Sequence, residues 1–200
     1  MSTLQIAVGL TLLAGVVGMA AAAPEGKPDL KPAAAAGAEP QMMAPKPGPH
    51  HQHLAMDVGT WDATMEAFGP PGTPPTVSKA VEVNTLTGNG LWLVSDYKGT
   101  FMGQPFQGHG VNGYDPAKNR YNGVWTDSLI TSPLILDGTC DGTGKVRTLT
   151  AQGPTPDGGT TTFTMVTDHP TPDTRTFTLS VPGPDGKQLT MMKISYKRRK

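Results

Sequence analysis

From Gly59 onward, apolar and polar residues alternate with a period of two through most of the chain. In the first such segment Trp61 and Met65 fall on one face, whereas Asp62 and Glu66 fall on the other. A period of two is that of a β-strand with one buried face. Turn-forming combinations of Gly, Pro, Asn and Asp interrupt the alternation about every ten positions, which is typical of a sandwich or a barrel.

The alternation and its interruptions predict about ten strands and one short helix. The helical pattern is confined to His51–Val58. The predicted strands cover residues 59–68, 76–87, 90–98, 101–113, 120–128, 132–139, 145–152, 160–168, 174–182 and 187–197. Short connections between successive strands favour an up-and-down meander that closes on itself. We therefore predict an all-β fold, a single antiparallel up-and-down barrel with a short N-terminal capping helix.

The chain divides by composition into three parts. Residues 1–23 contain an apolar run that ends in small residues, as secretory signal peptides do. Residues 24–49 are rich in proline and are expected to form a disordered linker, and residues 50–200 form the barrel domain. We expect cleavage of the signal peptide, export to the periplasm or the cell exterior, and no membrane contact afterwards. An uncleaved anchor is the alternative, because the apolar run nearly reaches membrane-spanning length.

Charge and cysteine content narrow the function classes. The formal net charge is zero, so the basic field expected of a nucleic-acid-binding protein is missing. Cys140 is the only cysteine, and no intrachain disulfide can form. We interpret this thiol as a small buried residue, since nothing marks it as a nucleophile.

Several short motifs follow one another in order along the folded part. They are Gly59-Thr60-Trp61 after His51 and Leu54, Gly90-x-Trp92-Leu93, Tyr97-x-Gly99, the glycine-rich run from Gly103 to Asp115, Trp125-x-Asp127-Ser128, Gly183 to Lys187, and Met192-x-Ile194-x-Tyr196-x-Arg198. This ordered set resembles domain-of-unknown-function family 1579, a bacterial family related to the calycins, over about residues 48–199. The resemblance implies a calycin-like barrel and no established activity. The chain departs from it at Arg175, where such proteins often carry an acidic residue.

The opening Gly59-x-Trp61 is also similar to that of lipocalins. That likeness implies a tryptophan at the closed end of the barrel, crossed by an arginine of the last strand. The alternation agrees, because Arg198 shares the predicted inward face of Tyr196. We therefore assign Trp61 and Arg198 a structural role, with the guanidinium lying over the indole ring.

Two other motifs are weak evidence for the binding sites that they resemble. The run Gly108-His109-Gly110-Val111-Asn112-Gly113 matches the dinucleotide fingerprint, but a turn and a strand follow it instead of a helix. We expect these glycines to allow strong coiling of a barrel strand. His50, His51 and His53 lack neighbouring ligands of metal-site spacing, and we expect them to cap the barrel. No metal and no cofactor is predicted.

The candidate binding residues are aromatic and apolar side chains expected to line the interior, with two polar contacts. They are Met65, Trp92, Tyr97, Phe106, Trp125, Phe163, Phe177 and Tyr196, with Asp127 and His169 as polar contacts. Our leading hypothesis is a barrel that binds one small apolar molecule. The second is a non-catalytic structural or interaction protein of the cell envelope. The third is haem binding through His169, as in some calycin-related barrels, or a hydrolytic activity. No catalytic residues are assigned.

Overall fold

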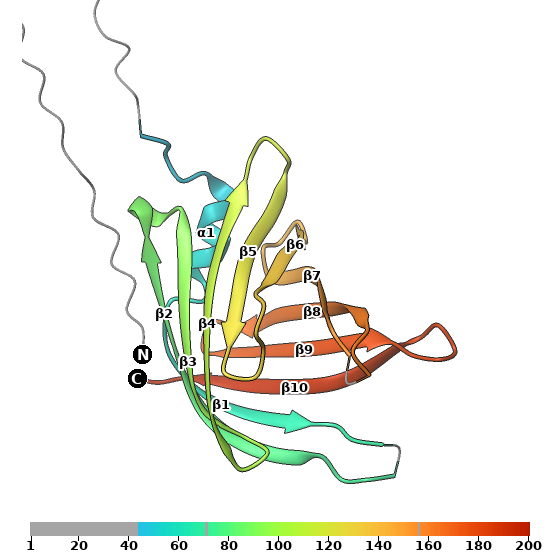
Figure 1. Ribbon diagram of the computed structural model, residues 1–200. Helices are drawn as coiled ribbons and strands as arrows, with labels where there is room; N and C mark the ends of the chain where they lie inside the picture. The colour runs from blue at the N-terminus through green and yellow to red at the C-terminus, as the bar shows by residue number, and fades with distance from the viewer. Residues whose placement is uncertain (1–43, 71, 156) are drawn as a thin grey trace, which may run out of the picture. The chain divides into compact units, whose positions relative to one another are not determined.

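Ten antiparallel strands close into one barrel in the residues that the computed structural model describes, 44–70, 72–155 and 157–200 (Figure 1). Each strand pairs with its neighbours in sequence, and β1 pairs with β10 to close the wall. The strands are β1 Gly59–Ala67, β2 Thr76–Thr87, β3 Trp92–Phe101, β4 Gln104–Asp115, β5 Arg120–Asp127, β6 Leu134–Cys140, β7 Val146–Pro154, β8 Thr160–Thr171, β9 Thr174–Pro182 and β10 Gln188–Arg198. This confirms the predicted fold class.

One helix, α1 (Pro49–Ala55), precedes the barrel, and a 3-10 turn, η1 (Gly88–Gly90), joins β2 to β3. The helix begins two residues earlier than the alternation suggested, because Pro49 at its first turn fixes a helical φ. It ends before Asp57, where the chain turns toward β1. The predicted signal peptide and residues 24–43 of the predicted linker lie outside the described residues. Within those residues, no helix has the length and apolar character needed to cross a membrane.

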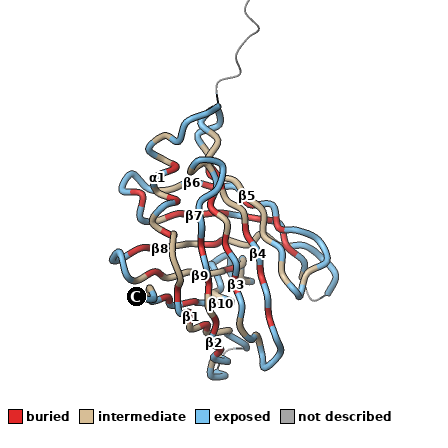
Figure 2. The backbone as a smooth tube through the Cα atoms, turned by 90° about the vertical axis from the view of Figure 1, so that its left-hand side faces the viewer, coloured by how far each residue is buried: buried red, intermediate tan, exposed pale blue. Residues whose placement is uncertain are grey.

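Side chains alternate between the inside and the outside of the wall, as the banding of buried and exposed positions shows (Figure 2). The buried interior consists of two apolar clusters. One contains Leu54 of α1 and residues of β3 and β5–β8, including Tyr121, Leu136 and Met165. The other contains Trp61 and residues of β1–β4 and β10. Trp125 and Phe177 contact both clusters and are themselves only partly buried.

The two ends of the barrel differ. We call the end at which α1 lies the capped end; it also carries the β2–β3, β4–β5, β6–β7 and β8–β9 connections. We call the opposite end, which carries the β1–β2, β3–β4, β5–β6, β7–β8 and β9–β10 connections, the open end. Figure 1 shows α1 among the upper strands and the β1–β2 and β3–β4 hairpins along the lower edge.

Candidate ligand-binding site

The glycine-rich strand β4 makes room for two tryptophan rings. A Cβ on Gly108 would lie 2.2 Å from the Trp125 ring, and one on Gly110 would lie 3.1 Å from it. Gly113 faces the other side of the sheet, where a Cβ would lie 2.4 Å from the Trp92 ring. These glycines therefore allow close approach of indole rings to the backbone, a more specific role than the strand coiling predicted from sequence.

Phe163 of β8 packs in the same way against β7. A Cβ on Gly153 would lie 2.0 Å from its ring. Phe163 and Trp125 both point inward, and both contact the cluster that contains Tyr121. Nevertheless Phe163, Trp125, Phe177 and Met192 are only partly buried. These inward-facing side chains therefore keep part of their apolar surface in contact with solvent.

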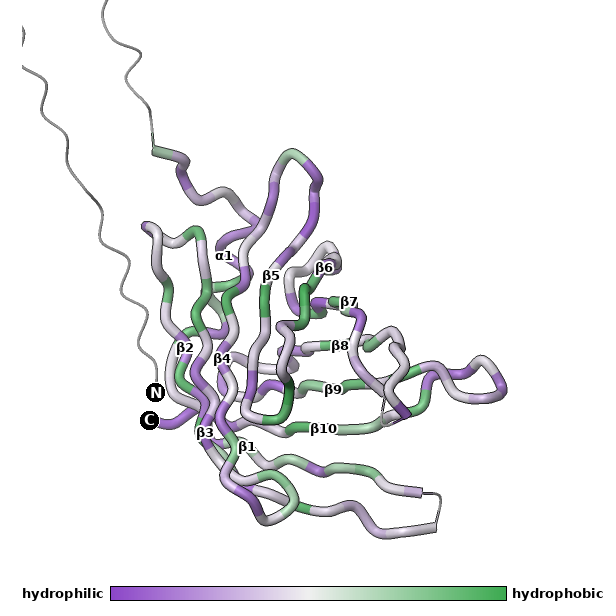
Figure 3. Tube along the Cα trace, viewed as in Figure 1, coloured by the Kyte–Doolittle hydropathy of each residue, from purple (hydrophilic) through white to green (hydrophobic). Residues whose placement is uncertain are grey.

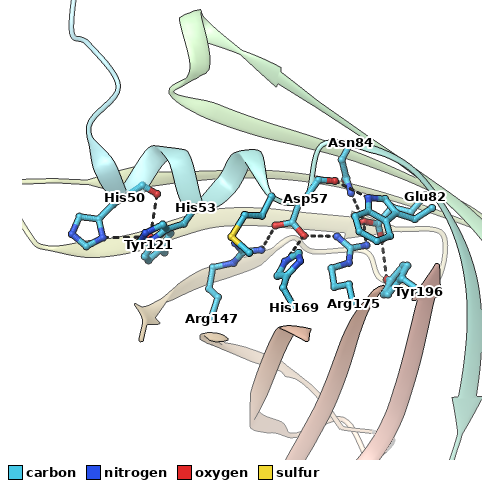
Figure 4. Close-up of polar contacts among 12 residues, drawn as sticks. His50, His53, Asp57, Glu82, Asn84, Tyr121, Arg147, His169, Arg175 and Tyr196 are labelled. Carbon is cyan, nitrogen blue, oxygen red and sulfur yellow. Dashed lines mark hydrogen bonds and ion pairs between the residues drawn. The ribbon is translucent and has the colours of Figure 1, made fainter. Parts of the chain in front are cut away.

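Charged side chains gather inside the capped end around Asp57, which is completely buried (Figure 4). Arg147 Nη2 donates to Asp57 Oδ2 at 2.7 Å, and Arg175 Nη1 donates to Asp57 Oδ1 at 2.5 Å. His169 Nε2 lies 3.2 Å from the same Oδ1 atom. Asp57 follows α1 directly, so these contacts join the cap to β7, β8 and β9.

Arg175 also connects Asp57 to a second buried carboxylate. Its Nη2 donates to Glu82 Oε1 at 2.6 Å, and the Tyr196 hydroxyl donates to Glu82 Oε2 at 2.9 Å. Asn84 Nδ2 donates to Glu82 Oε1 at 2.7 Å. The Arg175 guanidinium lies 3.9 Å from the centre of the Tyr196 ring and 4.9 Å from that of Trp61. Two carboxylates and two guanidinium groups thus balance one another in the protein interior.

The protonation states of this cluster follow from its contacts. Burial alone would raise the pKa of Asp57, but Arg147 and Arg175 outweigh it and hold that pKa well below its usual value. Burial and the charge of Glu82 raise the pKa values of Tyr97 and Tyr196. Both phenols are therefore neutral hydrogen-bond donors at neutral pH.

Some buried polar atoms of this region have no hydrogen-bond partner. They are Tyr97 Oη, Asn84 Oδ1, Arg147 Nε and Arg175 Nε. An unpartnered buried donor or acceptor costs about 1–3 kcal/mol. Water or a polar group of a bound molecule would reduce that cost. We call the inner side of the capped end the floor of the interior. It can therefore both donate hydrogen bonds to a polar group and accept them from it.

Trp61 and Arg198 form the structural pair at this end. Trp61 is fully buried, and its Nε1 donates to the Asp57 carbonyl at 2.7 Å. The Arg198 guanidinium lies 4.1 Å from the centre of the Trp61 ring, and its Nη2 donates to the Met56 carbonyl at 3.0 Å. Arg198 therefore holds the segment between α1 and β1 against the end of the barrel.

The sequence-predicted candidates occupy different places. Met65, Tyr97, Phe106 and Tyr196 are buried in the cluster that contains Trp61. Trp92 differs from expectation, because its neighbour Leu93 is the inward-facing residue and Trp92 is 41% exposed on the outer wall. It cannot line the interior.

The polar candidates are engaged locally. Asp127 accepts from Trp125 Nε1 at 2.9 Å and from the Leu129 amide at 2.8 Å, so it fixes the indole and the end of β5. His169 is buried and its Nε2 faces Asp57, which leaves that nitrogen no open side for an axial ligand. The residues around His169 therefore do not fit a haem.

The three histidines of the cap contact the barrel. His53 Nδ1 lies 2.9 Å from the Tyr121 hydroxyl, which donates to the His50 carbonyl at 3.1 Å. His51 is buried and its Nδ1 accepts from the Gly48 amide. Among the described residues, no group of three or more His, Cys, Asp or Glu side chains is arranged to hold a metal ion.

Two concave regions lie along the barrel wall. One of about 230 Å³ lies beside His169 and Arg198 at the capped end. It is smaller than the roughly 300–1,000 Å³ of most small-molecule sites. The other, of about 440 Å³, is a groove of the outer wall bordered by the exposed side chains of Asp62, Lys79 and Lys98. Neither contains the inward-facing aromatic residues.

Sequence reasoning missed the buried charge cluster, although a signal was present. Glu82 alternates in phase with Ala80, Arg147 with Leu149, and Arg175 with Phe177. Each charge thus falls on an inward position near the same end of the barrel. Arg175, noted only as a departure from an acidic residue, turns out to connect Asp57 with Glu82.

Comparison with known proteins adds the family and the fold. A family described as "Protein of unknown function (DUF1579)" matches residues 46–198. No curated protein matches the chain. The crystal structure of Rv2717c from M. tuberculosis is similar, with a TM-score of 0.54 and 18% identity, covering 76% of this chain and 99% of that chain. The S-type phycobiliprotein lyase CPES from Guillardia theta has a TM-score of 0.49 and 14% identity, covering 74% and 92% of the two chains. At 18% identity the likeness to Rv2717c shows the barrel fold alone.

Proposed function

The chain belongs to the family described as protein of unknown function (DUF1579), and we propose that its barrel binds one small, largely apolar molecule through the open end. One observation carries the proposal. Trp125, Phe163 and Phe177 point into the barrel, contact its core clusters and still keep partial exposure to solvent. An apolar molecule lying against them would remove that surface from water, and burial of apolar surface is the main source of affinity for such ligands.

Polar atoms at the floor of the interior would orient the ligand, with its polar end toward the capped end. Tyr97 Oη and Asn84 Oδ1 are buried without partners, so one can donate to and the other accept from a small polar group. The neighbouring charges of Glu82 and Arg175 already neutralise each other. A neutral hydroxyl, carbonyl or amide therefore fits this floor better than a free carboxylate. We propose an apolar body with one neutral polar end.

The chain provides its own optical reporter for the test. Trp61 is fully buried, Trp92 lies on the outer wall, and Trp125 faces the interior. In a Trp92→Phe background, tryptophan emission therefore reports mainly on the inside of the barrel. Titration with the neutral apolar fluorophore N-phenyl-1-naphthylamine should quench that emission by energy transfer. A long-chain primary alcohol should displace the fluorophore.

Substitutions on the inner and outer faces of the barrel wall test where the fluorophore binds. Phe163→Ser should weaken fluorophore binding by about tenfold, because it removes a phenyl contact. Ile135→Ser, which changes a 64% exposed residue of the outer wall, should leave the affinity unchanged. Near-ultraviolet circular dichroism checks that each variant keeps its packing. Equal binding to wild type and Phe163→Ser would refute the proposed site.

We also propose that the chain is exported. The apolar run of residues 1–23 and the proline-rich residues that follow it support this proposal. N-terminal sequencing of protein isolated from the cells that make it is the test. A new N-terminus within or just after the Ala20–Ala23 run is expected, and an intact Met1 would contradict cleavage.

A further inference from the structure

The loops at the open end carry exposed apolar side chains at their tips. Phe68 follows β1, Met102 lies in the β3–β4 turn and Leu129 lies in the β5–β6 loop; their exposures are 36%, 65% and 58%. Surface apolar residues scattered singly need no explanation, but clustered ones mark contact with another molecule or with lipid. These side chains can act together only if the loops that carry them are neighbours around the barrel.

Strand order places the three loops side by side. Since β2 pairs with β3 and β4 pairs with β5, the β1–β2, β3–β4 and β5–β6 loops are consecutive around the open end. On the other side of β1, the Phe68 amide donates to the Met191 carbonyl at 2.9 Å, and Met191 is 39% exposed. Phe68, Met102, Leu129 and Met191 therefore all belong to neighbouring loops and strands of the open end, and we call this set the apolar rim. Figure 1 shows the β1–β2 and β3–β4 hairpins along the lower edge of the molecule and the β5–β6 loop above the tip of the β3–β4 hairpin.

Charge separates this rim from the capped end. Residues 68–75, 102–103 and 128–133 contain no charged residue, whereas the other two connections of the open end contain Asp157, Asp185 and Lys187. The capped-end connections contain Lys118, Asp141, Lys145 and Asp173. Figure 3 shows the same contrast, with a hydrophobic β5–β6 loop and a hydrophilic stretch in the β4–β5 loop. The rim can thus leave water without burying a charge.

Met102 places an apolar side chain at a backbone position that favours other residue types. It has a φ of 49°, in the left-handed region, in the two-residue turn Met102-Gly103. Such turns favour Asn or Asp before Gly, because these residues tolerate a positive φ. The other non-glycine residues with positive φ in the described part of the chain are Asn89 and Asn119. A methionine here adds apolar exposure and backbone strain, and contact with an apolar phase would remove that exposure.

A band of lysines lies just behind the rim on the outer wall. Lys79 of β2, Lys98 of β3 and Lys193 of β10 are all exposed. Lys193 pairs across the strands with Glu66, whereas Lys79 donates to Thr64 Oγ1 at 2.6 Å and keeps its charge unpaired. Lysines that flank an apolar surface match the negatively charged headgroup layer of a bilayer.

We propose that the apolar rim docks on the surface of a lipid bilayer that contains anionic headgroups. The tips enter the boundary between headgroups and acyl chains, and Lys79 and Lys98 contact the headgroups. Separate tips on successive loops suit a fluid surface better than a shaped protein partner, because protein interfaces pack one continuous complementary patch. The sequence predicted no membrane contact after cleavage on the basis of the N-terminal run alone, and the rim is an independent feature. This docking turns the open end toward the lipid and does not require the proposed ligand.

A single dye on the full chain tests the proposal locally, so that the apolar N-terminal run cannot mimic the result. In a Cys140→Ser background, Met102→Cys carries an environment-sensitive nitrobenzoxadiazole dye, and Ala117→Cys carries it in the exposed β4–β5 turn of the capped end as a control. Vesicles of phosphatidylcholine with phosphatidylglycerol should shift the emission of the dye at position 102 to shorter wavelength and leave the dye at position 117 unchanged. Equal behaviour of the two positions would overturn the proposal.

Two further variants separate the apolar and the electrostatic contributions. Phe68→Ser with Leu129→Ser should weaken vesicle binding of the labelled rim by at least about tenfold. Lys79→Gln with Lys98→Gln should weaken binding to anionic vesicles by about tenfold and leave binding to pure phosphatidylcholine unchanged. A dye shift that needs no vesicles and grows with protein concentration would mean that the rim contacts a second copy, and would also overturn the proposal. The fluorophore titration above is unaffected by either result.

Discussion

At the scale of single residues, Asp57 has the most consequential position in the molecule. Its carboxylate receives Arg147 and Arg175 and faces His169, while its carbonyl receives Trp61 Nε1. One residue thus links the end of the cap to four strands. A buried ion cluster does not by itself imply high stability, because desolvation opposes the attraction between the charges. Removing one member, however, leaves the others buried and unpaired.

We expect Asp57→Asn to lower the free energy of unfolding by about 3–5 kcal/mol at neutral pH, since Arg147 and Arg175 lose a buried counter-charge. The pKa of Asp57 is lower in the folded state than in the unfolded chain. Its contribution is therefore complete above about pH 4 and is lost as the pH falls toward the folded-state pKa. Denaturant unfolding at a series of pH values should show a smaller acid dependence in the variant.

The control for that measurement is Asp185→Asn, a charge change in the exposed β9–β10 turn. It should leave both the stability and its acid dependence close to those of the wild type. An Asp57→Asn protein with unchanged acid dependence would show that other carboxylates dominate acid unfolding.

At the scale of elements, β4 shows how far a strand can be understood from its own sequence. The alternation predicted the strand and its inward face, and the absence of a following helix excluded nucleotide binding. What the strand alone did not reveal is that Gly108 and Gly110 lie under the Trp125 ring of β5. That contact depends on the register between the strands, in which Gly110 faces Trp125.

We expect Gly108→Ala to lower the free energy of unfolding by about 1–3 kcal/mol, because a Cβ would lie 2.2 Å from the indole and the ring must move. In a Trp92→Phe background the emission maximum of the folded state should also shift. Gly142→Ala is the matched control, since a Cβ there meets nothing within 4 Å. An unchanged emission maximum in Gly108→Ala would contradict the described position of Trp125.

The same comparison shows which part of the site was predictable. Period two correctly assigned Met65, Phe106 and Tyr196 to the interior, because parity within a strand is a local property. Trp92 was placed there for its aromatic character, although it and Tyr97 have opposite parity in one strand and cannot share a face. The meeting of Asp57, Arg147 and Arg175 was not predictable, because it depends on the curvature of the closed wall.

At the scale of the whole molecule, closure decides how stability is distributed. Strand β1 pairs with both β2 and β10, so the first and last strands of the chain depend on each other. A closed wall leaves no sheet edge available for pairing with other chains. It also makes the seam between β1 and β10 the contact with the greatest separation in sequence, which carries the largest loop-closure entropy.

A disulfide across this seam tests closure directly. Thr64 and Ser195 are paired across β1 and β10, and opposite residues of antiparallel strands have Cα separations that suit a disulfide. In a Cys140→Ser background, Thr64→Cys with Ser195→Cys should oxidise readily and raise the free energy of unfolding by up to about 4 kcal/mol, because the crosslink restricts nearly the whole unfolded barrel. Reduction should return the stability to that of the background protein. Shifting one cysteine by two residues, to Asp62→Cys with Ser195→Cys, displaces the pair along the seam and should crosslink more slowly. Equal crosslinking of both pairs would mean that β1 and β10 do not hold a fixed register, and a failure of both to crosslink would mean that the barrel is open there.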